Sequence, residues 1–574
     1  MKAAKTAKTP GELLFYTQRS PVTLDGVSIQ SYFPSLEQLF PSIADLKMGN
    51  PTLGARELAV DISDGVALIE NLQDHTTRTL PIWIRKCHLV DPIDVMSGDQ
   101  VLPGDGSLPY FREAWQSTLR KLNDPYNEAY TDAVFACMAS RLVETGRSPH
   151  FCRFFGTGNA RTPEYRYDVT SDMEDIEDED WFRDGLRGGA FKILAVDPED
   201  KSVFTEMTYP MLMKPAPRIN DASTSSSVSG GESTVSDAEE STEERGEEEI
   251  EEADIEASGE AVVHRPQIQL ARRPASHTSE SEESEGSEDD VDYVAVLRNF
   301  PVQFTVLERC DGTMDRLMVD ENDQPTADML ETKEQRWTAW IFQVIAGLVT
   351  AQQAYDFVHN DLHTNNVMWV GTGETHVYYH LTGVAGGDRY YRVPTYGRIM
   401  KIIDFGRATF RPKSASTDNR LWLPDAFSPE AVAGGQYNCG PYFEKGSPKV
   451  SPNRSFDLCR LAVAILDTLW WKEPAPIEPK KVLTKERGRT QYETASPLWN
   501  LMWLWLTDRR GENILRGPDG RERYPQFDLY CAIARDAMNA VPAQQLTMPL
   551  FDSTFRCVKK DIPADATIWT LAAK

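Results

Sequence analysis

The chain has 574 residues, too many for one simple hydrophobic core, which predicts two lobes or domains with insertions. Its formal net charge is −28, and residues 221–290 hold 22 acidic residues against 4 arginines and no lysine. The remainder is only mildly acidic, so no part has the basic surface that nucleic-acid binding requires. Eight scattered cysteines without a CxxC pair argue against a disulfide framework or zinc site and favour a reducing compartment.

The N-terminal residues carry positive charge but no apolar stretch, so a secretory signal is not expected. No run of 18 or more apolar residues occurs, and the most apolar segment, 337–349, is short and has helical spacing. These features predict an intracellular protein with no membrane partner. They leave the oligomeric state open.

Strand-like runs dominate the chain before residue 210. In chain order they are LAVDI (58–62), VALIE (66–70), LPIWIRKCHLV (80–90), HFCRFFG (150–156), AFKILAVD (190–197) and SVFTEMTY (202–209). The last two predict a hairpin with its turn at PEDK. A helical pattern covers 127–144, and the acidic stretch 171–182 predicts a solvated loop or a helix end.

Residues 215–293 are rich in Ser, Glu, Asp, Gly and Thr and lack any apolar period over their long acidic stretches. Such a segment cannot bury enough apolar surface to offset the entropy lost on ordering, so we expect a disordered insert. Its negative charge would attract basic protein substrates, an effect that salt would screen.

After the insert, FPVQFTVLE (300–308) predicts another strand, and helical periodicity then dominates. Only two short strands, VMWV (367–370) and IMKIID (399–404), are expected to interrupt it. A strand-rich half followed by a helix-rich half predicts a two-lobed α+β protein.

The stretch HNDLHTNN (359–366) is strongly polar, yet it lies between an apolar helix and an apolar strand. In isolation Asp361 would be interpreted as a turn or capping residue. Downstream, IMKIIDFGRATF places Asp404 at the end of a strand and before a Phe and a flexible Gly, 38 residues after Asn366. The pattern H-x-D-L-x-x-x-N followed by D-F-G, in this order and context, indicates a catalytic site.

The chemistry that these residue types suit is phosphoryl transfer. That reaction needs metal ions to neutralise a triphosphate and a carboxylate to orient the attacking hydroxyl. Oxygen ligands suit Mg²⁺, and groups on two separate loops can bracket it. We therefore expect Asp404 and Asn366 to be the metal ligands and Asp361 to accept the proton of the hydroxyl.

The chain resembles a eukaryotic-type protein kinase and, more narrowly, the serine/threonine-type kinases of large DNA (giant) viruses. The narrow match rests on NEAY with LVETGRSPHF, VQFTVLERCDGTMD, HNDLHTNNVMWV, VPTYGRIMKIIDFGRA, GGQYN and PNRSFDLCRLA, within most of residues 80–465. The resemblance implies a two-lobed kinase-like fold that uses ATP and Mg²⁺. It also implies these divisions: an N-terminal extension (1–55), an N-lobe with the insert (56–308) and a C-lobe (309–574).

Several further positions acquire roles through this resemblance. Lys86 resembles the strand lysine that holds the α- and β-phosphates, and Glu128 resembles its helix partner, with Asp132, one turn later, as the competing acid. Leu307 resembles the gatekeeper. The backbone of Glu308, Arg309 and Cys310 resembles the hinge that grips adenine, and Asp457 resembles the helix acid that supports the catalytic loop.

The sequence also departs from the family pattern. No clear G-x-G-x-x-G precedes Lys86, where only Gly54 and Gly65 lie nearby. Asn360 replaces the Arg that usually pairs with a phosphorylated activation loop, so activity is expected to be independent of such phosphorylation. Two positions after the base, where serine/threonine kinases commonly have Lys, this sequence has His363. In this it resembles haspin-type kinases and aminoglycoside-type phosphotransferases, so the substrate class is left open. FSPE (427–430) resembles Ala-Pro-Glu but lies unusually far from Asp457.

Three functions remain open at this point. The first is an active kinase that transfers the γ-phosphate of ATP to Ser/Thr hydroxyls of proteins, including basic ones. The second is a pseudokinase that serves as a binding module or scaffold, as the degenerate glycine loop suggests. The third is a small-molecule phosphotransferase. If the viral resemblance holds, the expected location is the host cytoplasm or the virion.

Overall fold

A computed structural model gives the chain a mixed α+β fold, as the sequence predicts. The structure describes residues 22–24, 27–30, 34–35, 56–104, 107–109, 115–170, 172–197, 203–208, 291–319, 327–384, 386–411, 450–470, 472–524 and 528–572. Most of the N-terminal extension, most of the acidic insert, FSPE and GGQYN lie outside these residues, so the predictions made for them stay predictions. None of the described helices is long and apolar enough to span a membrane.

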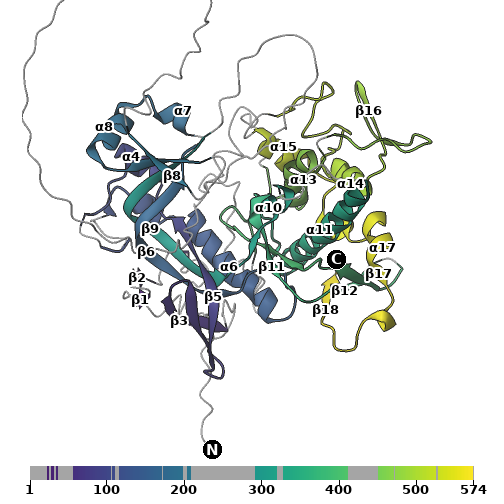
Figure 1. Ribbon diagram of the computed structural model, residues 1–574, viewed down its shortest axis with the longest axis horizontal. Coiled ribbons are helices and arrows are strands. Elements are labelled where there is room, and N and C mark those ends of the chain that lie inside the picture. Colours follow the sequence, from purple (N-terminus) through teal and green to yellow (C-terminus); the bar gives the residue numbers. More distant parts are fainter. Residues whose placement is uncertain are drawn as a thin grey trace, which may run out of the picture.

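The N-terminal part, residues 56–308, is built around one sheet (Figure 1). Its strands are β3 (Glu57–Ser63), β4 (Val66–Asn71), β5 (Thr77–His88), β6 (Phe154–Asp168), β7 (Lys192–Val196), β8 (Phe204–Met207) and β9 (Asp292–Glu308). The order β6-β9-β5-β4-β3 places β9 in the middle, and β1 (Val22–Leu24) and β2 (Val27–Gln30) extend the sheet beyond β6. The strands expected from sequence are present, but β6 and β9 are much longer than predicted because they pair with each other over almost their whole length.

Helix α6 (Glu128–Glu144) packs against β5, β6 and β9 and lies between the sheet and the helices of the C-terminal part (Figure 1). Asn127 caps it, since its side chain accepts from the amide of Ala129 and donates to the carbonyl of Leu89 at 2.9 Å. Nearly every side chain of α6 is buried, which explains why its sequence is apolar on all sides. This helix therefore holds its few polar groups inside the protein.

Smaller helices complete the N-terminal part: α4 (Pro92–Ser97), α5 (Leu119–Leu122), α7 (Met173–Ile176) and α8 (Asp180–Gly188). Helices α7 and α8 lie in the stretch where the sequence predicts a solvated loop or a helix end. Their acidic residues face solvent, but Phe182 is buried against Phe191 with ring centroids 5.6 Å apart. The segment is therefore helical and anchored by aromatic side chains, because a few apolar residues among the acids suffice to dock it.

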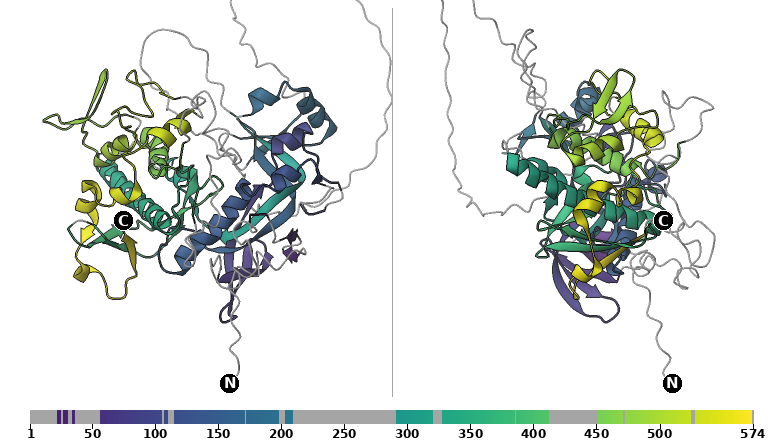
Figure 2. Two further views of the ribbon diagram at one scale, coloured as in Figure 1. Left: turned by 180° about the vertical axis from the view of Figure 1, so that it is seen from behind. Right: turned by 90° about the vertical axis from the view of Figure 1, so that its right-hand side faces the viewer.

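The C-terminal part, residues 309–572, contains most of the remaining helices (Figure 2). They are α10 (Met314–Val319), α11 (Ala327–Tyr355), α13 (Phe456–Leu469), α14 (Pro497–Trp505), α15 (Asp528–Asp536), α16 (Pro542–Gln545) and α17 (Pro549–Phe555), with the 3₁₀ turns η2 (Thr364–Asn366) and η3 (Lys559–Asp561). Helix α13 packs against α14, α15 and η2. The tryptophans of α14 are buried.

The C-terminal part holds more strands than the sequence indicates. The predicted pair is present as β11 (Val367–Gly371) and β14 (Arg398–Ile402), with β10 (Gly312–Thr313) beside β11. Unpredicted strands are β12 (His376–Thr382), β13 (Arg389–Pro394), β15 (Val482–Glu486), β16 (Arg489–Tyr492), β17 (Arg556–Cys557) and β18 (Ile568–Ala572). Strand β18 pairs with β12 from almost 190 residues away, a contact that local periodicity cannot reveal.

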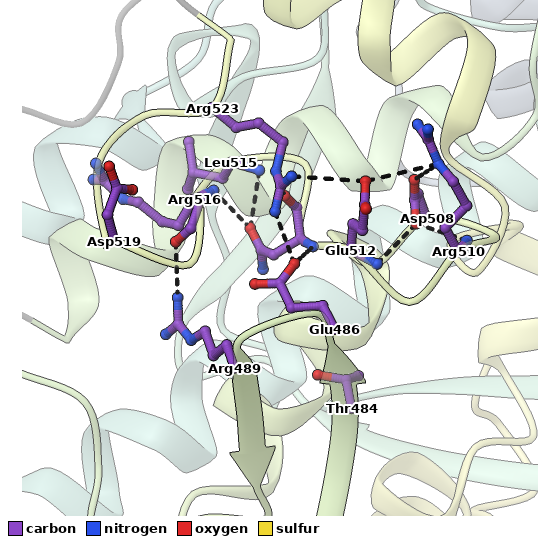
Figure 3. Close-up of polar contacts among 12 residues, drawn as sticks. Thr484, Glu486, Arg489, Asp508, Arg510, Glu512, Leu515, Arg516, Asp519 and Arg523 are labelled. Carbon is purple, nitrogen blue, oxygen red and sulfur yellow. Dashed lines mark hydrogen bonds and ion pairs between the residues drawn. The ribbon is translucent and has the colours of Figure 1, made fainter.

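A polar cluster fixes the loop that follows α14 (Figure 3). Glu486 of β15, whose side chain is 6% exposed, accepts from Arg523 at 2.7 Å and from the amide of Asn513 at 3.2 Å. The Asn513 side chain in turn accepts from the amides of Leu515 and Arg516. The loop thus satisfies its backbone through buried side chains rather than through regular secondary structure.

His150 joins the N-terminal part to the C-terminal part. Its Nδ1 donates to the carbonyl of Met400 at 3.0 Å, and its Nε2 accepts from the hydroxyl of Tyr379 at 2.7 Å. The ring is fully buried, and burial is the main cause that lowers its pKa to about 3. The imidazole is therefore neutral in the folded protein at any pH near neutrality.

We expect deletion of residues 221–290 to leave the fold intact. Because β8 pairs with β7 and β7 pairs with β9, Met207 and Asp292 lie two strand spacings apart across one sheet and three residues apart along it, about 14 Å in all. The remaining connection, 208–220 and 291, can span roughly 45 Å. The shorter loop should leave the free energy of unfolding unchanged or raise it by up to about 1.5 kcal/mol in urea titrations. A loss of stability in this variant would show that the insert packs on the fold.

Replacement of His150 by Gln should reduce the acid sensitivity of the protein. Below pH 6.5 the unfolded chain binds a proton at His150 that the native state does not bind until about pH 3, so stability falls with pH across that window. Between pH 6.5 and 5, the wild type should lose about 1.5 kcal/mol more unfolding free energy than His150→Gln. Urea titrations at the two pH values measure this difference, and equal losses would contradict a buried neutral imidazole.

Candidate active site

The polar stretch 359–366 forms a loop whose backbone is hydrogen-bonded to Asp457 of α13. The Asp457 carboxylate accepts from the amides of His359, at 3.0 and 3.1 Å, and of Asn360, at 3.1 Å. Asn360 has a positive φ of 62°, and its side chain donates to the carbonyl of Arg407 at 3.0 Å. The supporting position predicted for Asp457 is confirmed by these contacts.

Asp457 is fully buried, and this burial raises its pKa to about 6, against the opposing effects of His359 and the amide donors. A buried carboxylate is costly unless donors surround it, and here two consecutive amides supply them. These bonds fix the backbone immediately before Asp361. The direction of the Asp361 side chain is therefore set by a helix in the core.

Asn366 ties the two ends of this loop together. Its Nδ2 donates to the carbonyl of Asp361 at 2.9 Å and to Nε2 of His363 at 3.2 Å. Because both hydrogens of the amide are used, Oδ1 of Asn366 is the atom left to serve as an acceptor or ligand. Burial lowers the pKa of His363 to about 4, so its ring is neutral and can accept this bond.

Asp404 follows strand β14 and is brought beside the loop by the backbone. The amide of Ile403 donates to the carbonyl of Asn366 at 3.1 Å, and Nε2 of His359 donates to the carbonyl of Ile403 at 2.8 Å. Asp404 itself has a positive φ of 68°, an uncommon conformation for a residue with a side chain. The structure therefore brings Asp361, Asn366 and Asp404 together, as the sequence predicts.

Phe405 anchors the residue after Asp404 in the core. Its ring lies 4.8 Å from that of Phe135 on α6, and its amide donates to Asp132 of the same helix at 2.7 Å. The D-F-G segment is thus fixed on one side by aromatic packing and on the other by a buried carboxylate. Both contacts come from α6, so this helix determines where Asp404 lies.

The basic residue that contacts the acids of the site is Arg85, and the phosphate contact predicted for Lys86 stays a prediction. Arg85 forms ion pairs with Asp404 at 2.6 Å and with Asp132 at 3.0 Å. Within the described structure Lys86 forms no ion pair with either acid or with Glu128. Neighbouring side chains of a strand point to opposite faces of the sheet, so a shift of one residue decides which of them enters the site.

The acid of α6 that contacts a cation of β5 also differs from the one expected, Glu128. Asp132, the competing acid one turn after Glu128, makes the contact with the strand cation. Glu128 instead lies 3.7 Å from Arg407, beyond the D-F-G segment. Asp132 is 2% exposed, so its contact with Arg85 lies inside the protein. A shorter acid fits because Arg85 supplies a longer and forked cation.

Burial and mutual attraction together set the pKa values of Arg85, Asp132 and Asp404. Burial raises the pKa of Asp132, and Arg85 opposes that effect. Burial also favours a higher pKa for Asp404, but the Arg85 guanidinium outweighs burial, so the pKa of Asp404 is lowered. The pKa of Arg85 is raised well above its ordinary value by the two carboxylates, which overcome its own burial. The site therefore carries one permanent cation beside an ionised Asp404.

The segment predicted as the hinge joins β9 to β10. The amide of Glu308 donates to the carbonyl of Arg153 at 2.9 Å, and its carboxylate accepts from Lys401 at 3.1 Å. The thiol of Cys310 lies 3.5 Å from that of Cys152. These contacts hold the connection between the two parts of the chain. The adenine contacts predicted for Glu308 and Cys310 stay predictions.

The donor set at Asp404 and Asn366 fits a hard cation. Both residues offer oxygen, the donor that Mg²⁺ prefers, and the Asp404 side chain is 27% exposed. The described residues contain no group of three or more His, Cys, Asp or Glu that could hold a metal alone. A metal here would consequently take its remaining ligands from water and from phosphate oxygens.

Two residues of the candidate site escaped the sequence analysis altogether. Arg85 adjoins the predicted lysine, and the local sequence does not separate the two, because apolar residues precede them on both faces of β5. Tyr530 of α15 donates to Oδ1 of Asp361 at 2.6 Å, and nothing in its local sequence points to that role. Neither the models of protein families nor the curated proteins compared with this sequence gave a match.

Replacing Arg85 should destabilise the protein far more than replacing Lys86. The variant Arg85→Met leaves the buried Asp132 carboxylate without its cation, which should cost about 3 kcal/mol of unfolding free energy. The matched control Lys86→Met should change it by less than about 0.5 kcal/mol. Urea titration of both variants at pH 7 gives the comparison, and a larger loss for Lys86→Met would restore the original assignment.

Proposed function

We propose that the protein is an ATP-dependent kinase that phosphorylates Ser/Thr hydroxyls of protein substrates and that its two parts act as the lobes of a kinase-like fold. The observation that carries this proposal is the convergence of Asp361, Asn366 and Asp404 on one loop pair, with Arg85 on Asp404. A general base, two oxygen ligands and a fixed cation are the groups that phosphoryl transfer requires.

Each side chain has a distinct task in the proposed reaction. Asp361 accepts the proton of the substrate hydroxyl while the hydroxyl oxygen bonds to the γ-phosphorus of ATP. The bond between that phosphorus and the bridging oxygen breaks, and ADP leaves with the electron pair. Arg85 pairs with the phosphates through its planar guanidinium, which takes the place proposed earlier for Lys86.

Asp404 and Oδ1 of Asn366 would hold Mg²⁺. When bound, the ion supplies neutralisation of the triphosphate charge. Arg85 lies within 2.6 Å of Asp404 in this structure, so its guanidinium keeps the carboxylate ionised and in place. On nucleotide binding we expect Arg85 to turn toward the phosphates while Asp132 retains it at the other edge.

A pseudokinase is the alternative that one observation favours. The Asp404 carboxylate is already engaged by Arg85, and it must give up part of that contact before it can bind a metal. A scaffold that binds partners without catalysis would tolerate the same ion pair permanently. A small-molecule phosphotransferase is kept only because of His363, whose neutral ring differs from the lysine common in serine/threonine kinases.

The relationship to kinases of large DNA viruses and the intracellular or virion location stay predictions. So does the preference for basic proteins, which rests on the acidic insert. We propose these substrates because residues 221–290 alone carry −18 of the formal charge, from 22 acidic residues and 4 arginines.

Substitution of Asp361 by Asn should abolish transfer without preventing nucleotide binding. The base acts on the hydroxyl rather than on ATP, so the rate should fall by about 100- to 10,000-fold while ATP affinity is kept. Asp404→Asn should instead weaken binding of ATP with Mg²⁺. The measurements are transfer of labelled γ-phosphate to histone and calorimetric binding of a non-hydrolysable ATP analogue.

The matched control is Asp388→Asn, which changes an exposed acid that pairs with His380 away from the site. This variant should transfer phosphate at the wild-type rate. If wild type and Asp361→Asn have equal activity, or if both are inactive yet bind nucleotide, the enzyme proposal fails and the pseudokinase alternative gains support.

A further inference from the structure

A tyrosine from the far end of the chain contacts the proposed base. Tyr530 lies on α15, and its hydroxyl donates to Oδ1 of Asp361 at 2.6 Å. The ring is fully buried, and Asp361 is 3% exposed. A hydrogen bond this short to a carboxylate belongs to the strong, charge-assisted kind. The contact therefore fixes one of the two oxygens of the base.

Arg460 contacts both the hydroxyl and the ring of this tyrosine. Arg460 lies on α13, one turn after Asp457, and its Nε donates to the hydroxyl of Tyr530 at 3.1 Å. The guanidinium also lies 5.2 Å from the centre of the Tyr530 ring. An arginine with no exposed surface is rare. Here its charge draws electron density from the phenol oxygen, which makes the hydroxyl a better donor.

The phenol is a permanent donor at this position. Burial is the main cause that raises the pKa of Tyr530 far above its ordinary range, and the nearby Asp361 charge acts in the same direction against Arg460. The hydroxyl thus keeps its proton at any pH at which the protein functions. Helix α15 packs against α13, and this packing also holds the Tyr530 ring in place beside Asp361.

The local sequence does not offer another cation to Asp361. The position two residues after it is His363, whose Nε2 is occupied by the amide of Asn366. The Arg460–Tyr530 pair supplies a donor to the same carboxylate, with a positive charge beside the phenol oxygen.

We propose that Tyr530 is a positioning residue for Asp361 and that Arg460 holds the Tyr530 hydroxyl in this role. This inference rests on the proposed kinase function. With Oδ1 held by the phenol, Oδ2 is the oxygen left to accept the proton of the substrate hydroxyl. The carboxylate is thereby fixed in one rotation before substrate arrives.

The variant Tyr530→Phe tests this directly, because it removes one oxygen and little volume. The value of kcat should fall about 10- to 100-fold, while the KM for ATP stays unchanged. The acidic limb of the pH–rate profile should move to higher pH, since the ionised base loses a donor. The matched control is Tyr379→Phe, which removes an equally buried hydroxyl bonded to His150 and should leave kcat unchanged.

A stability cycle gives a readout that does not depend on activity. Unfolding free energies are measured for the wild type, Tyr530→Phe, Asp361→Ala and the double variant. The double variant should lose less than the sum of the single losses, because both single changes remove the same bond. The same cycle with Tyr379→Phe in place of Tyr530→Phe should be additive.

The possible outcomes separate the two proposals. An active wild type whose kcat and pH profile are unaffected by Tyr530→Phe overturns this inference alone. Additive losses in the Tyr530 cycle overturn it as well. An inactive wild type with a non-additive cycle overturns the proposed kinase function while the contact between Tyr530 and Asp361 stands.

Discussion

The guanidinium of Arg85 lies between two carboxylates that come from different elements, and the geometry of the candidate site depends on this placement. Asp132 belongs to α6, whereas Asp404 follows β14 in the other part of the chain. Because Asp132 also accepts from the amide of Phe405, one buried acid fixes both the cation and the D-F-G backbone. The sheet of the N-terminal part therefore positions the loop that carries Asp404 through Arg85 of β5 and through helix α6.

A second buried carboxylate performs the corresponding task within the C-terminal part. Asp457 binds the amides before Asp361, and Arg460, one turn further along α13, reaches Asp361 through Tyr530. One helix thus controls both the backbone and the side chain of the proposed base. Buried charges are costly unless they are paired, which explains why every one of these groups has at least one partner at hydrogen-bond distance.

The sequence was sufficient for the parts of the site that are local in the chain. Asp361, Asn366 and Asp404 sit in short motifs between apolar elements, and the structure brings them together. The choice between Arg85 and Lys86 depended on which face of β5 meets α6, and this stays ambiguous because Trp83 and Ile84 place apolar side chains on both faces. Tyr530 lies 169 positions from Asp361, and the pairing of β18 with β12 is similarly distant. Such contacts arise from tertiary packing and leave no periodic signal.

The most direct measurement is a crystal structure of the full chain with Mg²⁺ and a non-hydrolysable ATP analogue. The account predicts phosphates beside Arg85, a metal bound by Asp404 and Oδ1 of Asn366, and the hydrogen bond from Tyr530 to Asp361 retained. It predicts adenine against the backbone at Glu308 to Cys310. Nucleotide bound elsewhere, or a metal with neither Asp404 nor Asn366 among its ligands, would contradict the assignment of this site to phosphoryl transfer.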